Sequence, residues 1–302
     1  METMQLLKYE VIFHWIALLF YLFSVVFFMD HVISRRKRAL KIGVWLALIG
    51  LIAHSVALGV RWYAVGHGPY LEKSESFSAI VWLVLIMFMV FAYRVPGLRA
   101  TGIVVLPVCL VVMILGLIYN QWLANLLRQI VQQGRAETQG LLPGGAMIRP
   151  PRTFHGIWFI SHITSTVAAL GAILISVSTA ILYLLKSKRA EGELYKGLPS
   201  IEVIDDYSFK FAGMGFIFWT IMLVTGALWA DQAWGRYWGW DTIEIWSLVT
   251  WLLMGIYLHL RKFFRWQGRK AAWLILVCFI FSIATVFVIS FVMKTVHSEF
   301  FL

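Results

Sequence analysis

Tryptophan is concentrated in one stretch, WADQAWGRYWGWDTIEIWSLVTW (residues 229–251), which holds six of the fifteen tryptophans. Tryptophan is common where a membrane meets water, because its ring is apolar while its N–H needs a polar partner. An aromatic belt is therefore one explanation, but so many indoles beside acidic side chains favour a binding platform for a large, flat, aromatic ligand. The residues predicted to contact that ligand are Trp229, Trp234, Trp238, Trp240, Asp241, Glu244 and Trp246.

Three histidines near the ends of apolar segments are candidate metal ligands. His162 lies near the outer end of the fifth apolar segment, and His297 lies just past the last one. His259 follows Glu244 by a helical distance of about 22 Å, at 1.5 Å per residue. Two axial nitrogens of one iron lie only about 4 Å apart. The sequence therefore predicts an outer site with His162 and His297 and a separate inner site with His259.

These residue types suit non-covalently bound haem b. Two imidazoles fill both axial positions of haem iron, and indole faces stack on a porphyrin. The haem propionates need cations or N–H donors at the wet edge of the site, and Arg61, Arg149, Arg152 and Arg236 are the candidates. Asp241 and Glu244 stand three residues apart at a helix start, where capping is favoured over catalysis. No residue is assigned as catalytic. The second ligand of the inner haem is left open between His31, His54 and a partner subunit, and a helix-capping role for His259 is the alternative to ligation.

The composition places these residues in a membrane. The chain is 61% hydrophobic and only 14% charged, so its 302 residues could not form an ordinary soluble domain. We expect an all-α, polytopic membrane helix bundle that forms one domain over residues 1–302. Apolar segments long enough to span a bilayer are predicted at about 9–29, 42–60, 77–93, 100–118, 156–185, 211–230, 244–260 and 271–293.

The charge distribution predicts the orientation of this bundle. The net charge is +11, and most of the Lys and Arg residues fall in alternate loops, which the positive-inside rule places in the cytoplasm. Both termini and residues 229–251 then lie on the external face, and the basic excess does not indicate a nucleic-acid partner. Residues 119–152 are expected to form an external loop that begins with an amphipathic helix. Residues 198–211 could start a short interfacial helix, and Cys109 and Cys278 are expected to be buried, inert thiols.

The run GALWADQAWGRYWGWDTIEIWSLVTWLLMGIYLHLR resembles the tryptophan-rich WWD motif of membrane proteins that handle haem. The resemblance is closest to the CcsA (ResC) family of system II cytochrome c biogenesis. The stretches RWYAVGHGPYLEKSES, GIWFISHITSTVAAL and LPSIEVIDDYSF agree in order, so it covers the chain from about residue 54 onward. It implies that the WWD residues hold haem at the outer face, that His162 and His297 are the external axial ligands, and that His259 is the intramembrane ligand.

The resemblance also implies a function, namely haem handling and export for cytochrome c maturation. The protein would accept haem from the cytoplasmic side and present it for thioether attachment to the Cys-x-x-Cys-His motif of apocytochrome c, as a subunit of a cytochrome c synthase. Its implied partners are a CcsB/ResB-like membrane subunit, apocytochrome c and a thiol-reducing protein, in a bacterial cytoplasmic membrane or a thylakoid. The alternatives are a haem exporter without a ligation role and a bis-histidine electron-transfer membrane cytochrome. Haem handlers of the CcmC and CcmF types share the WWD motif.

Overall fold

The computed structural model describes residues 2–34, 36–70, 72–118, 156–188 and 198–289. These residues are almost entirely helical, and no strand occurs among them. The elements are α1 (Glu2–Ser34), α2 (Lys37–Val65), α3 (Lys73–Arg94), η1 (Pro96–Thr101), α4 (Gly102–Ile118), α6 (Ile157–Lys188), α7 (Ile201–Trp234), α8 (Thr242–Phe263), α9 (Arg269–Ile283) and the π-helical η4 (Ala284–Ile289).

Within the described residues, eight helical segments are long and apolar enough to cross a membrane. This confirms the predicted all-α polytopic membrane bundle. One boundary differs, because residues 201–210 form the first turns of α7 and not a separate interfacial helix. Ser200 caps the helix by accepting a hydrogen bond from the Val203 amide, and no Gly or Pro interrupts the chain until Gly213. Nothing in this stretch therefore ends a helix once it has begun.

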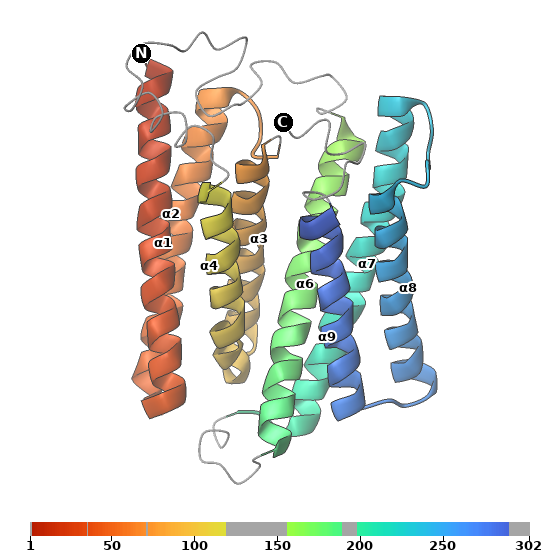
Figure 1. Cartoon of the computed structure of the whole chain (residues 1–302). Coiled ribbons are helices and arrows are strands. Elements are labelled where there is room, and N and C mark those ends of the chain that lie inside the picture. The colour runs from red at the N-terminus through yellow and green to blue at the C-terminus, as the bar shows by residue number, and fades with distance from the viewer. Residues whose placement is uncertain (1, 35, 71, 119–155, 189–197, 290–302) are drawn as a thin grey trace.

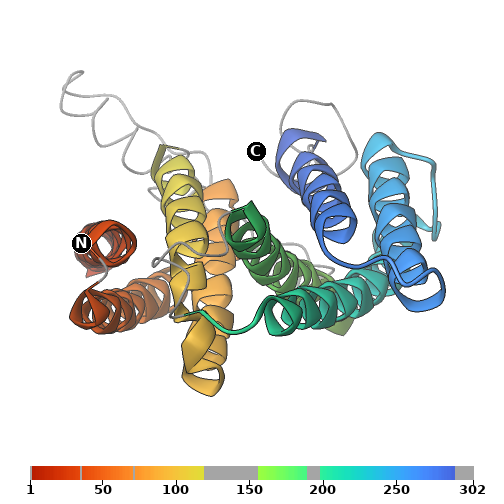
Figure 2. The same cartoon turned by 90° about the horizontal axis from the view of Figure 1, so that it is seen from below.

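The helices form two groups of four that lie side by side, as Figures 1 and 2 show. Helices α1 to α4 enclose one apolar cluster around Tyr21, Leu85 and Phe88. Helices α6 to α9 enclose a second cluster around Ile173 and Trp219. Small residues allow close helix contact, which is the usual mode of packing in membranes. A Cβ atom added at Gly50, for example, would lie 2.7 Å from the Tyr21 ring.

The connection between α7 and α8, the connection between α2 and α3, and the start of α6 all lie at one end of the molecule (Figure 1). We call this the outer end, following the predicted orientation, and the opposite end the inner end. The N-terminal end of α1 also lies there (Figure 1). The predicted external loop at 119–152 and the C-terminal residues 290–302 are outside the described residues.

Candidate ligand-binding site at the outer end

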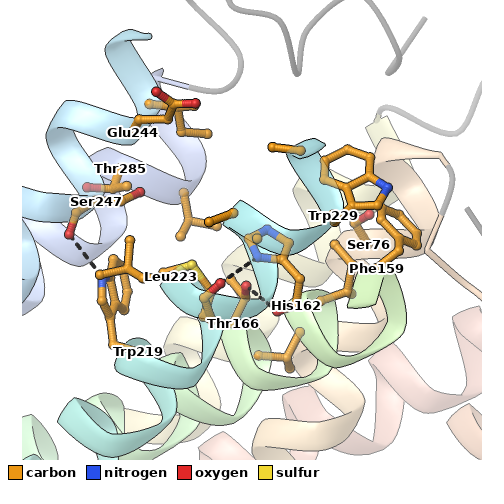
Figure 3. A pocket seen from close by; sticks show the side chains of 18 of the residues that line it. Ser76, Phe159, His162, Thr166, Trp219, Leu223, Trp229, Glu244, Ser247 and Thr285 are labelled. Atoms are coloured by element: carbon orange, nitrogen blue, oxygen red, sulfur yellow. Dashed lines mark hydrogen bonds between the residues drawn. The ribbon is translucent and has the colours of Figure 1, made fainter. Parts of the chain in front are cut away.

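A cavity opens at the outer end between α3, α6, α7, α8 and η4 (Figure 3). It encloses about 1350 Å³ of empty space, part of which is open to the surroundings. Its walls are mostly apolar and aromatic, with a few polar groups, as is typical of sites for large organic ligands. The lining residues include Phe159, His162, Trp219, Trp229, Trp238 and Glu244.

His162 of α6 lines this cavity, and a backbone carbonyl determines the state of its ring. The Nδ1 atom lies 2.9 Å from the carbonyl oxygen of Met222 in α7. A carbonyl can only accept, so Nδ1 carries a proton, and in the neutral ring the lone pair is then on Nε2. A neutral imidazole oriented through its other nitrogen is the usual form of a metal-ligating histidine. The geometry therefore suits His162 to act as an axial ligand.

Gly226 makes this contact possible. It lies four residues after Met222 on α7, one turn along the same face of the helix. A Cβ atom at this position would lie 2.6 Å from Nδ1 of His162, closer than such atoms approach. The absence of a side chain at Gly226 thus lets the imidazole lie directly against the α7 backbone.

Trp229 fixes the plane of the His162 ring. Its indole is only 3% exposed and stacks on the imidazole, with ring centroids 6.3 Å apart and an interplanar angle of 20°. Figure 3 shows the two rings on the same side of the cavity. Trp229 also packs against Phe159 at 5.0 Å and against Trp234 at 4.9 Å. Trp229 therefore lies beside the candidate ligand His162, and Trp234 packs behind it against Trp229.

The turn between α7 and α8 is built around a carboxylate. Gly235 ends α7 in a left-handed conformation, with a φ of 71°. Asp241 is the N-cap of α8 and forms a reciprocal capping box with Glu244. Glu244 Oε2 accepts hydrogen bonds from the amides of Gly239 at 2.8 Å and Asp241 at 3.1 Å. The capping role predicted for the two acids is confirmed, and Glu244 in addition contributes to the cavity wall.

Trp238 supplies a buried hydrogen-bond donor beside the cavity. Its Nε1 atom is buried and has no acceptor among the described residues. A buried N–H without an acceptor costs free energy, which a carboxylate or carbonyl on a bound ligand would recover. The residues present thus fit a flat aromatic ligand that carries an acidic group, as haem does.

Three of the five predicted tryptophans, Trp234, Trp240 and Trp246, are not among the described residues that line the cavity. Trp240 is 70% exposed and has a φ of 56°, which is unusual for a residue other than glycine. Trp246 stacks on Phe281 of α9, with centroids 5.6 Å apart. The tryptophan-rich segment therefore lines the cavity with only some of its indoles.

Arg61 does not occupy the wet edge of the site, as the sequence suggested. It is only 1% exposed, and its guanidinium is bound by the carboxylates of Glu10, Glu72 and Glu75. These three carboxylates already compensate the positive charge of Arg61. Arg61 is therefore not available to bind a haem propionate. Burial raises the pKa of Glu72 to about 7, although the Arg61 guanidinium lowers it. Two further candidate arginines, Arg149 and Arg152, and the second outer ligand His297 lie outside the described residues.

His259 lies four residues before the end of α8, which runs without a break from Glu244. The two residues are thus about 22 Å apart along the helix, as predicted. The His259 side chain is exposed at the surface of the chain, against Phe263 at 4.6 Å and Phe264 at 5.8 Å. Nearby, Arg261 donates to Asp205 of α7 at 2.7 Å, which fixes the inner end of α8.

The two histidines considered as inner partners are engaged in other contacts. His31 Nδ1 lies 3.1 Å from the Arg36 carbonyl in the turn after α1. His54 is fully buried, with Nε2 2.7 Å from Ser78 Oγ and Nδ1 3.2 Å from the Tyr21 hydroxyl. Because both ring nitrogens of His54 are hydrogen-bonded, it could bind iron only after these contacts break.

The sequence did not reveal several groups that shape the outer cavity. The contact of His162 with Met222 is made by a backbone carbonyl, which every residue has. The identity of residue 222 therefore could not predict it. Trp219 lies on the cavity wall, where its Nε1 donates to the Ser247 carbonyl at 3.1 Å (Figure 3). Arg61 directly follows the predicted span at 42–60, whereas α2 continues past it to Val65, so its buried position could not be read from the sequence.

The eight apolar helices among the described residues define an integral membrane protein, and its tryptophan-lined cavity with a histidine on the wall is a candidate site for a large aromatic ligand. Residues 70–297 match the family described as Cytochrome C assembly protein, and the chain belongs to this family.

The curated relatives agree with this family. A cytochrome c biogenesis protein CcsA from Chlamydomonas reinhardtii is 30% identical over 215 residues, which are 70% of this chain and 55% of that protein. CcsA from Trieres chinensis is 25% identical over 88% of this chain and 85% of its own length. CcsA from Guillardia theta is 25% identical over 98% of this chain and 93% of its own length. The similarity to CcsA thus extends along nearly the whole chain, and the chain spans about half the length of the Chlamydomonas protein.

Proposed function

We propose that this protein acts in cytochrome c biogenesis by binding haem b in the outer cavity and presenting it to apocytochrome c. In this proposal haem reaches the cavity from the cytoplasmic side, and the apocytochrome thiols of Cys-x-x-Cys-His add to its vinyl groups. The observation that carries the proposal is the His162 imidazole, which the Met222 carbonyl holds as the Nδ1–H tautomer beside a tryptophan-lined cavity.

The residues of the chain act by positioning. His162 supplies one axial ligand, and His297 is proposed as the other. Trp229 holds the plane of the imidazole, and Glu244 holds the turn that carries Trp238. Holding a cargo in one orientation beside its reaction partner lowers the entropic part of the barrier. Bound haem would contribute the vinyl groups and an iron whose ligands keep it in place.

His259 is proposed as an inner ligand that receives haem first. Its side chain is exposed on the surface of α8 near the inner end, so a second ligand would come from another subunit. A CcsB/ResB-like membrane subunit is the proposed source, and a thiol-reducing protein is the proposed source of free apocytochrome thiols. The membrane would be a bacterial cytoplasmic membrane or a thylakoid, with the cavity on its external side.

Absorption spectra of the purified protein test the proposal, with His162→Ala, His297→Ala and His259→Ala compared. Either outer substitution should remove or shift one haem population and leave the inner one, and added imidazole should restore the outer signal. Unchanged spectra with normal cytochrome c maturation in all three variants would refute the assignment. Spectral loss with normal maturation would favour an electron-transfer cytochrome, and haem export without attachment would favour a simple exporter.

A further inference from the structure

The side chain of Arg61 ties three elements together at the outer end of the molecule. Its Nε and Nη2 atoms donate to Glu75 and Glu72, both at 2.8 Å, and Nη1 lies 3.4 Å from Glu10. Glu10 belongs to α1, whereas Glu72 and Glu75 mark the start of α3. A buried guanidinium with three carboxylates is costly to assemble and is expected to serve a specific arrangement.

The carboxylates that bind Arg61 also determine where α3 begins. Glu72 is the N-cap of α3 and forms a capping box with Glu75, whose Oε2 accepts from the Glu72 amide at 3.1 Å. On the other side, α2 ends at Gly66, which has a φ of 77° and donates to the Trp62 carbonyl. The connection between α2 and α3 is therefore fixed at both ends within a short distance of Arg61.

Tyr70 reaches from this connection to the outer cavity. Its amide donates to the Gly68 carbonyl at 2.9 Å, and its ring covers Gly68 so closely that a Cβ there would collide with it. The Tyr70 ring meets Phe159 edge to face, with centroids 5.5 Å apart. Phe159 in turn packs on Trp229. Offset and edge-to-face pairs of this kind have preferred geometries. The position of one ring therefore restricts the position of the ring that it contacts.

From these contacts we propose that Arg61 is a positioning residue for the outer site, which acts through the α2–α3 connection and Tyr70. Arg61 fixes the start of α3, the connection places Tyr70 against Phe159, and Phe159 supports Trp229, on which the His162 ring stacks. This inference rests on the proposed function, because its consequence is the orientation of the haem ligand His162.

Three variants of the full-length protein test this inference. Arg61→Lys keeps the positive charge. Its ammonium group, however, lacks the forked guanidinium geometry that binds three carboxylates. Tyr70→Leu leaves the ion cluster intact and removes only the contact with Phe159. The matched control is Ser78→Ala, which breaks the contacts of His14 and His54 with the Ser78 hydroxyl in the same half of the bundle without touching the connection.

Two measurements are made on each variant. The first is the amount and low-spin absorption of the outer haem, with and without added imidazole. The second is hydrogen–deuterium exchange in the haem-free protein, for peptides that cover 62–70, 157–163 and 226–234. Arg61→Lys and Tyr70→Leu should lower outer haem occupancy by roughly two- to tenfold, as expected for loss of one aromatic contact, with partial recovery in imidazole. Both should raise exchange in the peptides at 157–163 and 226–234, while Ser78→Ala lowers thermal stability and changes neither measurement.

Wild-type occupancy and exchange in Tyr70→Leu would overturn the inference, whatever Arg61→Lys does, because Tyr70 is the link to the cavity. An equal loss in Ser78→Ala would also overturn it, since the effect would then follow from general destabilisation. The His162→Ala variant separates this inference from the proposed function. If His162→Ala leaves the outer haem unchanged, the proposed function fails. If His162→Ala loses that haem while Tyr70→Leu keeps it, only the positioning role fails.

Discussion

The two halves of the bundle place histidines in different surroundings. In the half formed by α6 to α9, His162 gives one nitrogen to a backbone carbonyl and lies on the wall of a cavity. In the half formed by α1 to α4, His14 and His54 are bridged by Ser78, with Nε2 atoms at 2.8 and 2.7 Å from its oxygen. His14 and His54 thus hold helices together inside one half, whereas His162 lies on the wall of a cavity in the other half.

The hydrogen bonds in the α1–α4 half have one consistent direction. His14 Nδ1 faces the Glu10 carbonyl at 3.1 Å and must carry a proton, so His14 Nε2 accepts from the Ser78 hydroxyl. Ser78 then accepts from Nε2 of His54, and Nδ1 of His54 accepts from the Tyr21 hydroxyl. In this series of hydrogen bonds each donor has an acceptor while both imidazoles stay neutral. Such a network holds helices together in a membrane, where unmatched polar groups are costly.

The largest effect is expected when the Arg61 cluster is broken. Arg61→Ala would leave three buried or nearly buried carboxylates without their cation, and the free energy of unfolding should fall by about 3–5 kcal/mol. The apparent unfolding midpoint in detergent and the yield from membranes measure this change. The matched control is Lys210→Ala, because Lys210 is 60% exposed and pairs with exposed Asp206, so little or no loss of stability is expected. Equal effects of the two substitutions would contradict the cost assigned to burial.

The next largest effect concerns His162. Gly226→Ala would place a methyl group against Nδ1 of His162 and push the ring away from the Met222 carbonyl, at a cost of about 1–3 kcal/mol. Outer haem absorption should fall while the inner population remains. Gly213→Ala is the control on the same helix, since a Cβ there has no atom within 4 Å. An unaltered spectrum in Gly226→Ala would show that the carbonyl contact is not required.

A smaller effect is expected in the polar network. Tyr21→Phe removes the hydroxyl that donates to His54 and should lower the free energy of unfolding by about 0.5–1.5 kcal/mol. The haem spectra should not change, because this network lies away from the cavity. Thermal unfolding and absorption measured on the same sample check both expectations, and a spectral change would mean that the two halves are less independent than their contacts indicate.

A separate effect is expected in the pH dependence of stability. Burial raises the pKa of Glu72 from 4.5 to about 7, so the folded state holds this proton more tightly than the unfolded state. The stability from this group is complete below about pH 4.5 and is lost as the pH rises to about 7. Glu72→Gln should therefore show a weaker loss of the unfolding midpoint between pH 5 and pH 8 than wild type. Parallel pH profiles would indicate that Glu72 titrates normally.

Sequence reasoning succeeded where a residue's role follows from local chemistry. Asp241 and Glu244 were recognised as a helix start from their spacing, and the separation of His259 from the outer site follows from helical rise alone. It failed for Arg61, because a lone cation near a helix end looks the same whether it faces water or three carboxylates from two other helices. The pairing of His54 with Tyr21 and Ser78 was missed for the same reason.

By itself, the sequence determined the membrane class, the eight spans and the end of the molecule where tryptophan gathers, because hydrophobic length and residue type act locally. Only the tertiary structure decided that Trp229 and Trp238 line the cavity while Trp240 and Trp246 do not, and that His162 is held by a carbonyl of another helix. These outcomes depend on which helix faces pack together, and that is set by the combined shapes of side chains distant in sequence.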